Sequence, residues 1–110
     1  MTNANQLNKC AQYGVTPTPC DSHSKVGISE AVRQGVRPVY GLRCQPTDTT
    51  SGWYLWAGEW SDEDDFFLPL HVDHLTKWCP EAIPYLLLPP GWRFVVTDGY
   101  EDVWNQPAAE

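Results

Sequence analysis

The sequence has few basic residues. Seven lysines and arginines stand against fourteen aspartates and glutamates, giving a formal net charge of −7 and a pI near 4.7. Nucleic-acid phosphates and anionic lipid surfaces would repel such a chain, so we expect no nucleic acid and no membrane among its partners. The natural complement is a basic partner, although acidity of this degree often serves only solubility.

Targeting and cross-linking signals are also missing. No apolar run reaches membrane-spanning length, and the N-terminal residues lack the basic and apolar segments of a signal peptide. We therefore expect a cytoplasmic protein. Cys10, Cys20, Cys44 and Cys79 include no CxxC pair, so they predict neither a zinc site nor, in the cytoplasm, a disulfide. A Cys10–Cys20 bridge is conceivable only if the chain is exported.

Catalytic and metal-binding motifs are scarce. The chain has no GxSxG, P-loop or GxGxxG. His71 and His74 have HxxH spacing, but no second ligand cluster accompanies them, so we expect no metal. A hydrolase could pair Glu59 with Glu101 or Asp102, but a domain of this size leaves little room for a cleft. We predict a protein that is not an enzyme and needs no cofactor.

An aromatic run, residues 51–60 (SGWYLWAGEW), organises the chain. Its alternation predicts a central strand buried on both faces. Trp53, Leu55 and Ala57 would lie on one side, and Tyr54, Trp56 and Trp60 on the other. Of the six tryptophans, we expect Trp53, Trp56 and Trp92 in the core and Trp60, Trp78 and Trp104 nearer the surface.

The rest of the pattern predicts one α+β domain. Its length of 110 residues and its 42% hydrophobic content suffice for a single core. The expected elements are a short helix over 29–34, strands over 36–44, 92–97 and 100–104, a helix over 70–79, and a hairpin turn at Asp98-Gly99. We expect a mostly antiparallel sheet of four to five strands with short helices packed on it. Residues 1–24 would form an irregular arm, 25–104 the domain and 105–110 a flexible tail.

Residues 62–65 (DEDD) are the densest charge in the chain. Four adjacent carboxylates repel one another unless they are solvated or paired. They form either a docking patch for a basic partner or simply an exposed loop or first helical turn.

Taken together, several motifs resemble one bacterial family. They are Ser51-Gly52-Trp53 with Gly58-Glu59, Pro80, Tyr85-Leu86, Pro89-Pro90-Gly91-Trp92-Arg93-Phe94 and Tyr100-Glu101-Asp102-Val103-Trp104, preceded by Val39-Tyr40-Gly41-Leu42-Arg43. This pattern is similar to the immunity protein 33-like family, whose members are small cytoplasmic proteins often encoded beside polymorphic toxins. The resemblance covers about residues 25–104, and this chain departs from it in its longer, cysteine-bearing N-terminus and its proline-rich segment 83–90.

The resemblance implies inhibition of a cognate toxin by direct binding, with the toxin encoded by an adjacent gene. The net charge favours a basic, nuclease-type toxin. The hypothesis for the partner-binding surface comprises Glu59, Trp60, Asp62, Glu63, Asp64, Asp65, Glu101, Asp102 and Trp104, with the two tryptophans as anchors. The alternative is a non-catalytic module that binds a carbohydrate or peptide through exposed tryptophans.

Overall fold

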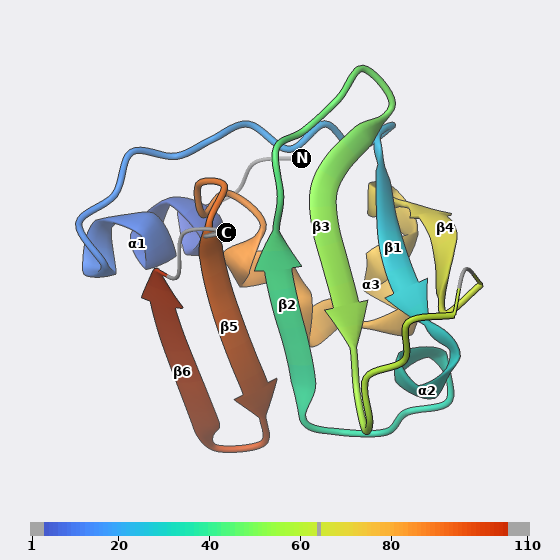
Figure 1. Cartoon of the computed structure of the whole chain (residues 1–110). Helices are drawn as coiled ribbons and strands as arrows, with labels where there is room; N and C mark the ends of the chain where they lie inside the picture. The colour runs from blue at the N-terminus through green and yellow to red at the C-terminus, as the bar shows by residue number, and fades with distance from the viewer. Residues whose placement is uncertain (1–3, 64, 106–110) are drawn as a thin grey trace.

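Six strands form a single sheet in the computed structural model, which describes residues 4–63 and 65–105 (Figure 1). The strands are β1 (Lys25–Ser29), β2 (Val39–Arg43), β3 (Thr50–Trp56), β4 (Phe67–His71), β5 (Trp92–Thr97) and β6 (Tyr100–Asn105). The α-helices are α1 (Ala4–Gln12), α2 (Glu30–Arg33) and α3 (Leu75–Trp78), and two 3-10 helices are η1 (Val72–His74) and η2 (Pro80–Tyr85).

The strand order across the sheet is β4-β1-β3-β2-β5-β6. β1 and β3 run parallel, and every other neighbouring pair is antiparallel. The predicted α+β class with a mostly antiparallel sheet is therefore confirmed, with six strands in place of four to five. The predicted hairpin at Asp98-Gly99 is also confirmed, and the strand of the aromatic run, β3, pairs with β2.

β3 is an interior strand, as predicted, and the backbone geometry near its start requires a glycine at position 52. Gly52 has φ +90°, and a Cβ placed there would lie 2.1 Å from the carbonyl oxygen of Cys44. The two backbones approach this closely because the amide of Cys44 donates a 2.8 Å hydrogen bond to the carbonyl of Gly52. Glycine adopts this left-handed conformation without strain, and because it has no Cβ it also leaves room for the carbonyl of Cys44.

The prediction that β3 is buried on both faces is wrong. Trp53 and Leu55 are fully buried on the face that packs against the helices, whereas Tyr54 and Trp56 on the other face are only partly buried. In Figure 1 α1 and α3 lie behind the sheet. The same alternation continues in β2, where Val39, Gly41 and Arg43 are buried and their neighbours are partly exposed. The sheet is thus covered on one side.

The expected irregular arm contains a helix. α1 has few apolar residues, and tertiary contacts hold it in place. Gln6 is buried and donates from Nε2 to the carbonyl of Ile83 at 3.0 Å, Cys10 enters the core, and Lys9 forms an ion pair with Glu101. Because these anchors lie far away in sequence, the local pattern gave little sign of the helix. Of the expected flexible tail, Asn105 ends β6, and residues 106–110 lie outside the described part.

The predicted helix over 70–79 is wrong in its first part. Phe67–His71 forms strand β4, which pairs with β1 in a register that places Leu70 opposite Val26. The helical spacing of Val72, Leu75 and Cys79 is real, but Val72 lies in η1, Leu75 in α3 and Cys79 directly after α3. Strand β4 ends where its pairing with β1 ends, and no local sequence signal marks that position.

Candidate functional site

The side of the sheet that no described helix covers, which we call the open face, carries side chains in two rows across the strands. The first row runs from Tyr54 to Leu42, Arg93 and Trp104, each opposite the next in register. The second runs from Trp56 to Tyr40, Val95 and Asp102. Most of these side chains are partly exposed. Six of these eight side chains are aromatic or aliphatic, and the other two are Arg93 and Asp102. We treat this partly exposed, mainly apolar side of the sheet as a candidate interaction site.

An aromatic cluster borders the open face on the side of β4. Trp56 stacks on Tyr40 with ring centroids 5.7 Å apart and an interplanar angle of 17°. On its other side Trp56 meets Trp60 edge-on at 5.0 Å, and Phe67 lies 5.4 Å from Trp60 and 5.1 Å from Tyr54. These edge and offset contacts favour a fixed arrangement of the rings. Trp60 nevertheless remains 53% exposed.

The acidic loop (residues 59–65) follows β3 and adjoins this cluster. Glu59, Asp62, Glu63 and Asp65 are exposed, and Asp64 lies outside the described residues. The indole Nε1 of Trp60 donates to Asp62 Oδ1 at 2.8 Å, and the amide of Glu63 donates to Ser61 Oγ at 3.1 Å. These local bonds hold the exposed indole beside the carboxylates. The structure therefore brings together Trp60 and the acidic residues expected near it.

Two of the other expected residues lie on the open face, and one lies on the opposite face. Asp102 and Trp104 end the two rows on β6. Glu101 instead accepts hydrogen bonds from Lys9 (2.7 and 3.0 Å), Tyr13 (2.8 Å) and Tyr85 (2.5 Å) on the helical side. Burial alone would raise the pKa of Glu101, but these donors outweigh it and the pKa is lowered. Glu101 thus holds α1 to the body of the domain.

Arg93 is the residue that the sequence-based surface omitted. Alternation along 92–97 already placed it on the face opposite Trp92 and Phe94. Its position between Leu42 and Trp104 became visible only with the strand register, because those neighbours come from β2 and β6.

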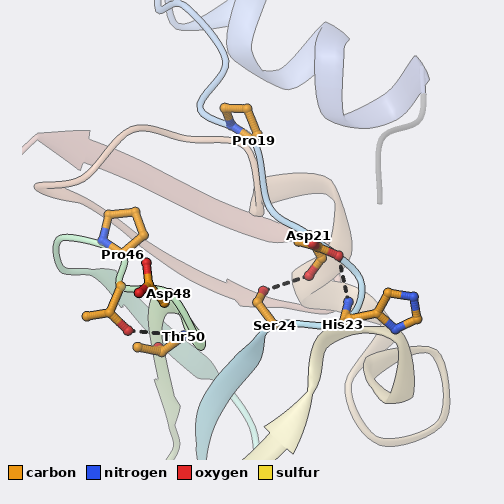
Figure 2. A pocket seen from close by; sticks show the side chains of 8 residues that line it. Pro19, Asp21, His23, Ser24, Pro46, Asp48 and Thr50 are labelled. Atoms are coloured by element: carbon orange, nitrogen blue, oxygen red, sulfur yellow. Dashed lines mark hydrogen bonds between the residues drawn. The ribbon is translucent and has the colours of Figure 1, made fainter.

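A separate cavity of about 300 Å³ lies between the loop before β1 and the loop before β3 (Figure 2). Asp21, His23, Asp48 and Thr50 are among its lining residues. Asp21 Oδ1 accepts from the amide of His23 at 2.9 Å, and its carbonyl accepts from Ser24 Oγ at 2.6 Å. In Figure 2 the ring of His23 points away from Asp48. These are the hydrogen bonds of ordinary turns, so the cavity presents no nucleophile–base pair.

The histidines and cysteines within the described residues form no metal-binding group. The rings of His71 and His74 are 5.8 Å apart at the surface, and the described residues contain no group of three His, Cys, Asp or Glu side chains able to hold a metal ion. Cys10, Cys20 and Cys79 are buried free thiols, and burial raises the pKa of each. None of the helices in residues 4–63 and 65–105 has the length and apolar character needed to cross a bilayer.

The side of the sheet that no described helix covers is thus rich in aromatic side chains, a residue class enriched in protein–protein interfaces. The chain matches the Imm33-like domain over residues 5–106 and belongs to the Imm33-like family. Membership implies an immunity protein that neutralises a toxin, in a family that is typically non-catalytic. The match also includes most of the helix α1. No curated protein and no solved structure shows significant similarity to the chain.

Proposed function

We propose that the protein neutralises its toxin by direct binding through the acidic loop and the adjoining open face, and that the toxin presents a basic surface, as a nuclease does. The observation that carries this is Trp60, a large aromatic side chain that is 53% exposed and lies beside the exposed carboxylates of the acidic loop. Tryptophan is enriched among the residues that dominate binding energy, and charges around an interface steer association.

The carboxylates would act mainly on encounter. Glu59, Asp62, Glu63 and Asp65 project from one loop of a chain with net charge −7. Their field attracts a basic surface and accelerates association. At a nuclease they would occupy positions that substrate phosphates otherwise take, which explains how binding would block activity.

The aromatic residues would supply the lasting contact. Trp60 is held by Trp56, Phe67 and Asp62, so little side-chain entropy is lost when a partner covers it. Asp102 and Trp104 would extend the same surface across the open face. Glu101 is left out because its carboxylate is already bonded to three side chains on the helical face.

Co-expression tests this function. We propose that the toxin is the product of an adjacent gene and that the two proteins meet in the cytoplasm. Cells producing that product should survive when this protein is present, and the two should co-elute as a stable complex. A neighbour that is neither toxic nor bound would contradict the proposal.

Charge reversal then tests the surface. The double substitution Asp62→Lys with Glu63→Lys should weaken toxin binding about tenfold or more, mainly by slowing association. Glu30→Lys with Asp73→Lys makes the same change in net charge at exposed positions on α2 and η1 and serves as the control. Equal losses in the two variants would show that only net charge matters, and the acidic loop would lose its assigned role.

A further inference from the structure

Arg93 is a cation in the middle of the uncovered apolar surface. In the strand register it stands between Leu42 on β2 and Trp104 on β6. Its own strand places Val95 next to it on the same face. The arginine stem can pack along such neighbours while its guanidinium faces outward.

The Nε atom of the Arg93 guanidinium is buried, and no residue in the described part of the chain accepts a hydrogen bond from it. The ion pairs formed among residues 4–63 and 65–105 do not include Arg93. Arg37, by contrast, is paired with Glu81, and Arg43 is satisfied by backbone carbonyls. A buried donor without an acceptor costs free energy. The Nε atom of Arg93 therefore calls for an acceptor from outside the domain.

We propose that Arg93 receives a carboxylate of the toxin and thereby sets the position of the toxin on the open face. This rests on the function proposed above. A partner that covers Leu42 and Trp104 removes the guanidinium from water, and only an anionic acceptor offsets both its charge and its unused donors. The toxin surface would then be basic around its edge, opposite the acidic loop, and would carry an acidic residue opposite Arg93.

Charge argues for this partner over a second copy of the chain. Two copies facing each other would each bring a net charge of −7 and an acidic loop to the interface. A basic toxin with one inward-facing carboxylate is complementary to both features. The pairing would also reject basic proteins that lack the carboxylate, because they would bury Arg93 without a partner.

The test compares Arg93→Gln with Arg33→Gln in binding to the purified toxin from the adjacent gene. Arg33 lies on α2 with its guanidinium over Trp78, 4.7 Å from the ring centroid, so its variant removes the same charge elsewhere. Arg93→Gln should weaken binding about 30-fold or more, mostly through faster dissociation. Arg33→Gln should remain within about threefold of the wild type, as expected of a charge outside the interface.

Two further measurements separate a contact from a structural role. Arg93→Lys keeps the charge but loses the planar fork, so its melting temperature should be unchanged while binding weakens about fivefold or more. Replacing the toxin's acidic residues singly with their amides should identify one whose change makes binding insensitive to Arg93→Gln. If no toxin residue has this effect, or if wild type and Arg93→Gln bind equally well, the inference is overturned and the proposed function still stands. If the wild-type protein fails to bind the toxin, both the inference and the proposed function are overturned. If the protein forms a dimer that Arg93→Gln dissociates, the open face binds a second copy of the chain instead.

Discussion

Trp53 and Arg43 donate hydrogen bonds to the same backbone carbonyl, that of Leu86, from Nε1 at 2.9 Å and from Nη1 at 3.0 Å. The guanidinium of Arg43 lies 5.8 Å from the centroid of the Trp53 ring. Arg43 also donates to the carbonyls of Ser51, Thr18, Leu88 and Pro19. One buried cation therefore ties β3, the segment before β1 and the loop after η2 together.

Replacing Arg43 by lysine should destabilise the fold severely. Arg43 is 1% exposed, and a lysine ammonium has fewer donors and cannot span carbonyls on different segments. We expect a loss of about 3 kcal/mol or more in the free energy of unfolding. Urea denaturation followed by tryptophan fluorescence measures it. Arg33→Lys is the control and should change the free energy by less than about 1 kcal/mol.

Gly52→Ala should be far more harmful than Gly14→Ala. Both glycines have positive φ, +90° and +70°, but only at Gly52 would a Cβ meet backbone, 2.1 Å from the carbonyl oxygen of Cys44. We expect about 1 kcal/mol of destabilisation at Gly14 from conformation alone and about 3 kcal/mol or more at Gly52. Thermal melts of the two variants provide the comparison. Similar melting temperatures would show that the close approach of the strands is not rigid.

Stability should fall on acidification through Glu101. Its pKa is lower in the folded protein than in the unfolded chain, so its contribution is present above the unfolded value of about 4.3 and is lost as the pH falls through the folded value. Glu101→Gln should cost about 1–3 kcal/mol at pH 7 and less at pH 3. Asp102→Asn, on the other face of β6, is the control. An equal loss for Glu101→Gln at both pH values would contradict the linkage.

Trp60→Ala should separate binding from folding. Because the side chain is 53% exposed, its loss should change the free energy of unfolding by less than about 1 kcal/mol. As an anchor, however, it should cost about 30-fold or more in toxin affinity. Leu7→Ala removes another exposed apolar side chain, 46% exposed on α1, and should leave affinity unchanged. If calorimetry shows the same affinity for Trp60→Ala and wild type, the indole is not an anchor.

The sequence predicted those elements whose signals are local. The hairpin between β5 and β6 was marked by Asp98-Gly99 and by alternation on both sides, and α2 by its apolar spacing and Gly35. The helix α1 was missed because Gln6 and Lys9 are fixed by Ile83 and Glu101. β4 was partly misassigned because its partner β1 lies far away in the chain.

The candidate site was predicted only in part for the same reason. The acidic loop and Trp60 are neighbours in sequence, so composition alone grouped them. Alternation placed Tyr54 and Trp56 on one face of the strand but gave no indication that no described helix covers that face. Asp102 and Glu101 were grouped by adjacency, although a strand directs adjacent side chains to opposite faces.

The strand order has a consequence for protein synthesis. β1 lies between β3 and β4, both made later, and the row from Tyr54 to Trp104 is complete only when β6 pairs with β5. Sheets with such distant pairings form late and slowly, so a growing chain on the ribosome cannot present the open face. On the binding surface proposed above, only a chain synthesised through β6 can engage the toxin.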